Sequence, residues 1–385
     1  MAILANRIRE LPPYLFSRLN ARKRDLEAKG IRVIDLGIGS PVLPPPKSLL
    51  EKLREELGKT GVHQYPPYQG TRVFREAVAR FYRNRYGVDL DPEREILVLI
   101  GSKEGIVHFL QAVLNPGDIA MLPDPGYPVY EAGVYLAGGK PETFPLKEEL
   151  SFMPDFGAIP ERNLEQTKVL FLNFPSNPTA AMAPIEVFTD TVRLAKKHRF
   201  LIAHDLAYGL VTFGGREAPS ILQVPGAKDV AIEFGSLSKS FNIAGWRVGY
   251  AVGNESAIRA LATVKSNTDT GQFSPLQAAG AFALDHWEEM VPENNEKLKK
   301  RMERLYAIFS RFGLKMKKPE STIFLWGRIP DGKNSLVFCD DLLEKSGILV
   351  TPGTAFGSRG EGYVRISFAV QMEDIDCVER RLLDL

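Results

Sequence analysis

Six short apolar segments between residues 95 and 252 constrain the fold of this chain more than any other feature. They are rich in β-branched and aromatic residues and are bounded by Gly, Pro, Asn or Asp. Their apolar residues are nearly continuous, which is typical of strands buried on both faces of a parallel sheet. Helix-like segments such as Gly105–Leu114 and Ile185–Arg199 separate them, so the sequence predicts an α/β fold with a doubly wound sheet. The six segments are Glu95–Ile100, Ile119–Pro123, Lys168–Asn173, Leu201–His204, Val230–Gly235 and Val248–Val252.

The C-terminal part of the chain has a different pattern. A long charged amphipathic segment, His286–Phe312, precedes three short apolar segments with Gly-rich turns between them: Thr322–Trp326, Ile348–Thr351 and Tyr363–Phe368. This pattern predicts a second, smaller α+β domain, and a length of 385 residues also favours two domains. We expect the segment before Pro44-Pro45-Pro46 to pack on this second domain, because it has no strand partner nearby in the sequence.

The composition excludes several classes of protein. Lys and Arg number 49 against 47 Asp and Glu, so no basic excess indicates nucleic acid as a partner, and the basic run Lys297–Arg301 is interpreted as a solvated helix face. Two cysteines exclude a disulfide scaffold and a multi-cysteine metal cluster, and no metal is expected. No run of 18 apolar residues occurs and no signal-peptide pattern is present, so we expect a cytoplasmic protein without a membrane span.

A glycine-flanked turn, Gly101-Ser102-Lys103-Glu104-Gly105, lies between a predicted strand and a predicted helix. Backbone N–H groups and the helix dipole at such a place can hold a phosphate. The spacing matches neither a Walker loop nor the dinucleotide fingerprint. Because glycines at strand-to-helix turns are often there for geometry alone, this turn is a candidate phosphate site only in combination with others.

A lysine with flanking hydroxyl groups follows another predicted strand. Lys239, beside Ser236 and Ser238, is a candidate for an amine of lowered pKa, the kind that reacts with carbonyl groups. The alternative is an ordinary loop lysine paired with a carboxylate. Arg247 follows eight residues later between two glycines, where its guanidinium could grip a phosphate, and this favours the first interpretation.

Two further segments follow predicted strands at the same edge of the sheet. Asn177 follows the third strand, while Asp205 and Tyr208 follow the fourth. Asn-Pro is also an ordinary turn former and Asp is a frequent helix cap, so each segment alone has a structural explanation. Together, however, a phosphate loop, an amide, a carboxylate, a phenol, a lysine and an arginine all fall at strand carboxyl ends.

In order along the chain, these segments resemble the motifs of the fold-type I, class I/II aminotransferases, which use pyridoxal phosphate. The resemblance covers nearly the whole chain, because Arg365 matches the family's arginine for the substrate carboxylate, and Ala180 replaces a usual glycine without touching a catalytic atom. It implies a large domain with a mostly parallel seven-stranded sheet flanked by helices, plus a smaller α+β domain. The matching segments are Gly101-Ser102-Lys103, Tyr127, Asn177-Pro178-Thr179, Asp205-x-x-Tyr208, Ser236-x-Ser238-Lys239, Gly245-Trp246-Arg247-x-Gly249 and Tyr363–Ala369.

The resemblance also implies roles for these residues. Lys239 would carry the cofactor and then move the proton between the substrate Cα and the cofactor, and Asp205 would pair with the ring nitrogen. Asn177 and Tyr208 would hydrogen-bond the ring oxygen, so Lys239, Asp205 and Tyr208 are the expected catalytic residues. Tyr127 would stack on the ring, and the phosphate would be held by Gly101, Ser102, Lys103, Ser236, Ser238 and Arg247.

Other matches concern assembly and substrate. Tyr65 resembles the tyrosine that reaches the neighbouring subunit's phosphate, which implies a homodimer with shared active sites. Tyr14 and Gly39 resemble residues on the substrate side, together with Asn177 and Arg365. The family's division implies that residues 1–46 join a small domain of residues 285–385, while residues 47–284 form the large cofactor-binding domain.

Within the family, four segments resemble the LL-diaminopimelate aminotransferases, which implies LL-diaminopimelate as amino donor and 2-oxoglutarate as acceptor in lysine biosynthesis. They are residues 36–39, 101–105, 124–130 and 224–230. Tyr68 stands where better-known members have a Glu that contacts the distal amino group, so aspartate, alanine and aromatic donors stay as alternatives. A carbon–sulfur β-lyase with the same cofactor is a further alternative, and a non-enzymatic regulator is disfavoured because Lys239, Asp205 and Arg365 are all present.

Overall fold

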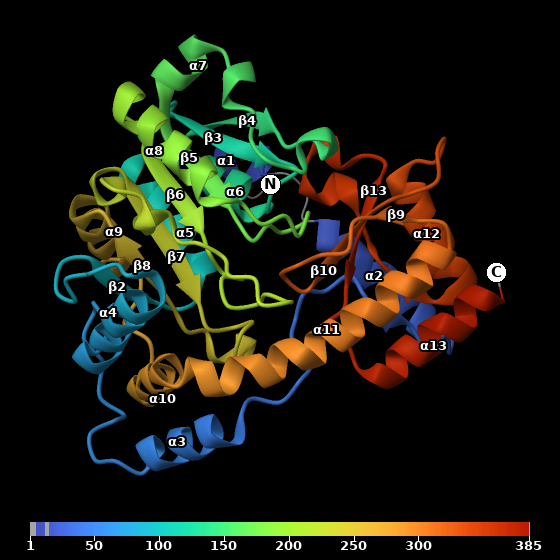
Figure 1. The fold of residues 1–385 in the computed structure, drawn as a ribbon, viewed down its shortest axis with the longest axis horizontal. Coiled ribbons are helices and arrows are strands. Elements are labelled where there is room, and N and C mark those ends of the chain that lie inside the picture. Colours follow the sequence, from blue (N-terminus) through green and yellow to red (C-terminus); the bar gives the residue numbers. More distant parts are fainter. Residues whose placement is uncertain (1–4, 12–14, 385) are drawn as a thin grey trace.

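The chain folds around a seven-stranded sheet in a computed structural model that describes residues 5–11 and 15–384 (Figure 1). The strand order is β2-β8-β7-β6-β5-β3-β4, and neighbouring strands are parallel except at β8, which is antiparallel to β2 and β7. This confirms the predicted α/β fold with a mostly parallel sheet. The strands are β2 (Ile96–Leu99), β3 (Ile119–Asp124), β4 (Lys140–Pro145), β5 (Thr167–Asn173), β6 (Leu201–Asp205), β7 (Ala231–Ser236) and β8 (Gly249–Gly253).

Six of these strands coincide with the six apolar segments of the sequence. The seventh, β4, lies at the edge of the sheet beyond β3 and was not among them. Lys140 and Glu142 on this strand are exposed, because one edge of β4 faces no further strand. An edge strand therefore lacks the continuous apolar run that marks the buried strands.

Helices cover both faces of the sheet. Alternate residues of one strand pack against two different groups of helices, one on each face. Val169 and Phe171 of β5 pack against the first group, and Leu170 and Leu172 pack against the second. Both faces are thus buried, as the uninterrupted apolar segments predicted. The first group is α5 (Ser102–Val113), α6 (Val129–Leu136) and α9 (Glu255–Ser266); the second includes α3 (Lys47–Leu57), α4 (Arg72–Tyr86), α7 (Glu161–Gln166), α8 (Ile185–His198) and α10 (Ser274–Asp285).

A second core forms around a four-stranded antiparallel sheet of order β12-β13-β10-β9. The segment expected as one strand over residues 348–351 is two short strands, because β11 pairs with the N-terminal strand β1 while β12 joins the small sheet. Ile34 of β1 lies opposite Ile348, which ties the N-terminal segment to this core. The strands are β1 (Ile34–Asp35), β9 (Lys315–Met316), β10 (Phe324–Arg328), β11 (Ile348–Leu349), β12 (Thr351–Pro352) and β13 (Tyr363–Ser367), and the helices of the two chain ends are α1 (Asn6–Glu10), α2 (Leu15–Ala28), α12 (Ser335–Ser346) and α13 (Met372–Leu383).

One long helix, α11 (Trp287–Arg311), runs from the large sheet to the small one (Figure 1). Met290 and Val291 belong to the core of the large sheet, whereas Leu298 belongs to the second core. The change of core therefore falls within α11 and not at its start. The interpretation of residues 297–301 as a solvated face is wrong for Arg301, which is buried and donates from Nε to the carbonyl of Val370 at 2.7 Å.

No helix among residues 5–11 and 15–384 is both long enough and apolar enough to cross a membrane.

Candidate active site

A cavity of about 390 Å³ opens at the carboxyl ends of β5, β6 and β7, beside Arg365 of the small sheet. Because parallel strands end at the same edge, side chains far apart in the sequence meet there. Twelve residues expected in the site line this cavity: Gly39, Ser102, Lys103, Tyr127, Asn177, Asp205, Tyr208, Ser236, Ser238, Lys239, Arg247 and Arg365.

Three other expected residues do not line it. Gly101 lies directly before Ser102 and begins α5 as its N-cap, with φ of 79°. Tyr65 is 88% exposed and is not among the residues that line this chain's own cavity. Tyr14 lies outside the described residues.

The start of α5 and the loop after β7 form a narrow basic cradle. A Cβ at Gly101 would collide with the guanidinium of Arg247, and a Cβ at Gly249 would lie 2.8 Å from the amide nitrogen of Ser102. Both positions therefore require glycine, because neighbouring atoms approach the backbone too closely to leave room for a side chain. Arg247 donates from Nη1 to the carbonyl of Ala244 at 2.8 Å, and burial, followed by the charge of Arg247, lowers the pKa of Lys103. Helix N–H groups and two cations converge here, as a phosphate requires.

Lys239 lies at the centre of the cavity. Its Nζ donates to the carbonyl of Gly39 at 2.5 Å, so the N-terminal segment closes over the amine. Burial, and then the positive charges of Arg365 and Arg247, lower the pKa of Lys239 to about 8. An amine with this pKa has a substantial neutral fraction near neutral pH, which nucleophilic attack on a carbonyl requires.

Asp205 is buried at the end of β6. Its Oδ2 accepts a hydrogen bond from the hydroxyl of Tyr130 at 2.8 Å, and its Oδ1 accepts one from the amide of Ala207 at 3.1 Å. Burial raises the pKa of Asp205, because few donors offset the loss of water around the carboxylate. A cationic ring nitrogen beside this carboxylate would supply the charge partner that a buried anion needs.

Two residues around Asp205 were missed in the sequence. Tyr130 lies three residues after Tyr127, in the first turn of α6, and this closeness to an expected site residue could have suggested it. Asn173 donates to the backbone carbonyl of Asp205 at 2.9 Å and accepts from the amide of Asn177 at 2.8 Å. Asn173 thus fixes the ends of β5 and β6 relative to one another, a role that no sequence motif indicates.

Arg365 of β13 lines the cavity from the small sheet. It donates to Oδ1 of Asn177 at 2.8 Å and to the carbonyl of Gly37 at 2.6 Å. The rings of Phe324 and Phe356 lie on either side, 4.1 Å and 4.6 Å from the guanidinium carbon. Phe324 was not expected from the sequence; it also lines the cavity and meets Tyr208 edge to face at 5.7 Å.

The charges of the lining residues fit pyridoxal phosphate. Four cationic side chains line the cavity, and Asp205 is the carboxylate among its lining residues. An anionic phosphate and a substrate carboxylate would balance the excess positive charge. The lysine, the buried carboxylate and the basic cradle correspond to the aldehyde, ring nitrogen and phosphate of this cofactor. The four cations are Lys103, Lys239, Arg247 and Arg365.

A separate acidic cluster lies beneath the start of α5. Oxygen and nitrogen atoms of Glu104, His108 and Asp269 approach one another closely enough to hold a metal ion. The buried ammonium of Lys265, however, donates to Asp269 at 2.6 Å and to Glu104 at 3.3 Å. Lys265 is thus a charge partner of both carboxylates, and the cluster is explained as an ion-pair network within the chain.

The sequence and the fold both match known aminotransferases. The family model described as aminotransferase class I and II matches residues 31–382. The LL-diaminopimelate aminotransferase of Aquifex aeolicus is 45% identical, and that of Natranaerobius thermophilus 43%; each alignment covers 99% of this chain and 98% of the relative. The structure of BacF from Bacillus subtilis superposes with a TM-score of 0.95 at 37% identity, over 100% of this chain and 98% of that one.

Members of this family use pyridoxal phosphate, and the match extends from the N-terminal strand to the last helix. The residues collected at the strand ends lie within the matched range. On this ground the chain belongs to the class I and II aminotransferases.

Proposed function

We propose that this aminotransferase binds pyridoxal phosphate in the cavity around Lys239 and takes LL-diaminopimelate as amino donor, with 2-oxoglutarate as acceptor, in lysine biosynthesis. The main support for this amino donor is the similarity to curated LL-diaminopimelate aminotransferases, which are 42–45% identical to this chain along almost its entire length. The charge pattern of the cavity supports the cofactor.

The cofactor, when bound, supplies an electron sink for the electrons left at the substrate Cα after deprotonation. Asp205 would hold the ring nitrogen in its protonated form, with Tyr130 fixing the carboxylate. Lys239 would take the proton from the substrate Cα and return it, because its amine has a lowered pKa and a neutral fraction at neutral pH. The cradle of Ser102 and Arg247 would anchor the phosphate during this transfer.

Arg365 would bind the substrate α-carboxylate. Its planar group is held between two phenylalanine rings and hydrogen-bonded to Asn177, so its orientation is fixed before substrate arrives. A planar guanidinium matches a carboxylate with two parallel hydrogen bonds.

We also propose a homodimer in which Tyr65 completes the site of a second copy. Tyr65 and Tyr68 are 88% and 56% exposed in one chain, which is unusual for two neighbouring tyrosines unless another surface covers them. Tyr65 does not line its own cavity. Residues 1–46 would move with residues 285–385 when the site closes, because β1 pairs with β11 and Gly39 touches Lys239.

The donor is tested by a half-reaction on purified holoenzyme, followed by stopped-flow absorbance of the cofactor. LL-diaminopimelate and glutamate should convert the cofactor rapidly to its amine form, whereas aspartate, alanine and phenylalanine should convert it slowly. Fast conversion by phenylalanine and slow conversion by LL-diaminopimelate would replace the proposed donor by an aromatic one. Turnover that continues without any added 2-oxo acid would indicate the β-lyase alternative, because transamination alone needs an acceptor.

The shared site is tested by mixing two inactive variants. Lys239→Ala lacks the amine, and Tyr65→Ala lacks the side chain proposed to cross between copies. In a mixed dimer, one site would combine Lys239 of one copy with Tyr65 of the other and recover activity. If activity does not recover after the copies exchange, Tyr65 acts within its own chain. A Tyr65→Ala variant that is fully active by itself would show that Tyr65 takes no part.

A further inference from the structure

The arginine of the basic cradle has an unusual backbone conformation. Arg247 has φ of 56° and ψ of 51°, which lie in the left-handed region. This region is disfavoured for a residue with a side chain, because its Cβ comes too close to the following carbonyl oxygen. Such a conformation persists only where neighbouring groups fix it. The group that fixes the backbone of Arg247 therefore also decides where its guanidinium lies.

Gln272 supplies the contacts that hold this turn. It lies in the segment between α9 and α10, and its Nε2 donates to the carbonyl of Trp246 at 2.6 Å and also to the carbonyl of Arg247. One carbonyl precedes the two rotatable backbone bonds of Arg247, and the other follows them. A single amide that binds both carbonyls therefore holds these two bonds in their left-handed rotation.

The orientation of the Gln272 amide is itself fixed. The side chain is 8% exposed, and its Oε1 accepts from the amide of Phe273 at 2.9 Å, so its Nε2 must face the two carbonyls. The backbone carbonyl of Gln272 accepts from the side chain of Gln277, which is fully buried. Gln277 in turn accepts from the amide of Thr71 at 2.6 Å. A chain of buried amides thus runs from the start of α4 to the cradle.

The opposite wall of the cradle is held from the same segment. Glu104, in the first turn of α5, accepts through Oε2 from the amide of Ile100 at 3.0 Å, two residues before the helix begins. Its Oε1 accepts from Lys265 of α9 at 3.3 Å. Residues 265–272 therefore contact both walls, the start of α5 through Lys265 and the arginine turn through Gln272.

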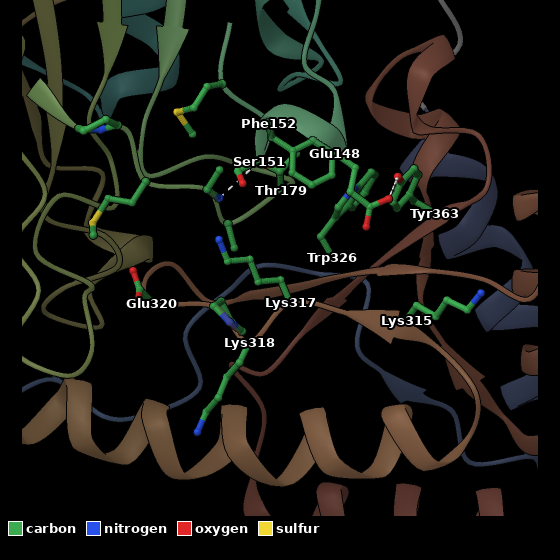
Figure 2. Close-up of a pocket in the computed structure, with 16 residues that line it drawn as sticks. Glu148, Ser151, Phe152, Thr179, Lys315, Lys317, Lys318, Glu320, Trp326 and Tyr363 are labelled. Atoms are coloured by element: carbon green, nitrogen blue, oxygen red, sulfur yellow. Dashed lines mark hydrogen bonds between the residues drawn. The ribbon is translucent and has the colours of Figure 1, made fainter. Parts of the chain in front are cut away.

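Three lysines at a second cavity, of about 310 Å³, do not converge in this way (Figure 2). The cavity lies between loops of the large and the small sheet, and the side chains of Lys315, Lys317 and Lys318 point in different directions. Lys318 pairs with Glu303 of α11 at 2.8 Å. Cations beside a cavity are thus not sufficient for a phosphate site, which also needs a backbone that directs them at one point.

We propose that Gln272 is a positioning residue for the phosphate of the cofactor. It does not line the cavity, and it acts by holding Arg247 in the conformation that directs the guanidinium into the cradle. This inference rests on the proposed binding of pyridoxal phosphate. Because Gln272 acts on the phosphate alone, the ring and the aldehyde of the cofactor should bind equally well without it.

The test compares two ligands that differ by the phosphate. Full-length enzyme freed of cofactor is titrated with pyridoxal phosphate and with pyridoxal, and the absorbance of the bound ligand is followed. Gln272→Met keeps the length of the side chain but removes its amide. It should raise the Kd of pyridoxal phosphate about tenfold, because both hydrogen bonds to the turn are lost, and should leave the Kd of pyridoxal within about twofold of the parent value.

Two further variants separate positioning from general damage. The matched variant Gln223→Met removes a side-chain hydrogen bond to the amide of Ser220 outside the cavity lining, and it should change neither Kd. Arg247→Met removes the guanidinium itself. If Gln272 acts through Arg247, adding Gln272→Met to Arg247→Met should raise the Kd of pyridoxal phosphate no further.

Equal weakening of both ligands by Gln272→Met would overturn the proposal, and so would an unchanged Kd for pyridoxal phosphate or additive effects in the double variant. If Gln272→Met does not fold, Gln272→Asn replaces it: its amide is too short to reach both carbonyls, and it should weaken pyridoxal phosphate about threefold and pyridoxal not at all. Parent enzyme that binds pyridoxal phosphate no more tightly than pyridoxal would overturn the proposed phosphate site, and this result is obtained without any change at Gln272.

Discussion

The environment of Lys239 predicts that its amine reacts at a far lower pH than an ordinary lysine. With a pKa of about 8, roughly one amine in ten is neutral at pH 7, against about one in three thousand for the usual value of 10.5. The neutral fraction, and with it the rate of attack on a carbonyl, is therefore about 300-fold higher at pH 7. The rate should rise tenfold per pH unit below pH 8 and level off above it.

Competitive labelling of the apoenzyme with a small neutral electrophile, followed by mass spectrometry of the peptides, measures this pKa directly. Exposed Lys300 of α11 serves as the internal comparison. The rate of pyridoxal phosphate capture should follow the same pH profile. Of the two arginines, Arg365 lowers the pKa of Lys239 more than Arg247 does. Arg365→Leu removes this charge, so the pH profile should move to higher pH, although burial remains the main cause of the lowered pKa.

The reasoning is refuted if labelling of Lys239 rises only near pH 10, in parallel with Lys300. It is also refuted if Arg365→Leu moves the profile to lower pH, because removal of a positive charge must favour the protonated amine.

Three further predictions concern single substitutions. Arg365→Lys should lower kcat/KM by about 30- to 1000-fold for every amino donor, since one charge-assisted hydrogen bond and the stacking with two rings, together about 2–4 kcal/mol, are lost. Steady-state kinetics that show an effect on only one donor class would contradict this. Asp205→Ala should reduce turnover about 100-fold or more while cofactor absorbance persists, and unchanged turnover would speak against its role. Glu233→Leu should lower the unfolding free energy by about 3–5 kcal/mol in urea titrations, because this fully buried carboxylate accepts from the hydroxyl of Tyr82 and pairs with His204, both at 2.7 Å; a loss below about 1 kcal/mol would show that these groups find other partners.

The main sheet could be predicted because its strands are buried on both faces. Continuous apolar runs of four to seven residues have few other structures open to them, and six of the seven strands follow from them. Edge strand β4 could not, since half of its surface faces water and its sequence is correspondingly mixed. The division of residues 348–352 into two strands of different sheets could not be predicted either, because it depends on the pairing of the N-terminal strand β1 with Ile348.

The collection of site residues was predictable for the same reason. Parallel strands end at one edge, so polar residues that follow them, such as Asn177 and Asp205, must lie near one another. The sequence did not indicate that Tyr130 holds the Asp205 carboxylate or that Phe324 lies against Arg365, because those contacts join elements far apart in the chain.

What the sequence by itself determined is the set of reactive groups available to the site: a lysine, a carboxylate, two arginines and a phosphate-binding turn, in the order of a known family. What only the tertiary structure decided is the state of these groups and what surrounds them. The lowered pKa of Lys239 arises from burial and from two arginines, one of them 126 residues away on another sheet. The burial of Trp326 against Phe356 and Tyr363 likewise depends on tertiary packing, because burial is a property of packed neighbours and not of local sequence.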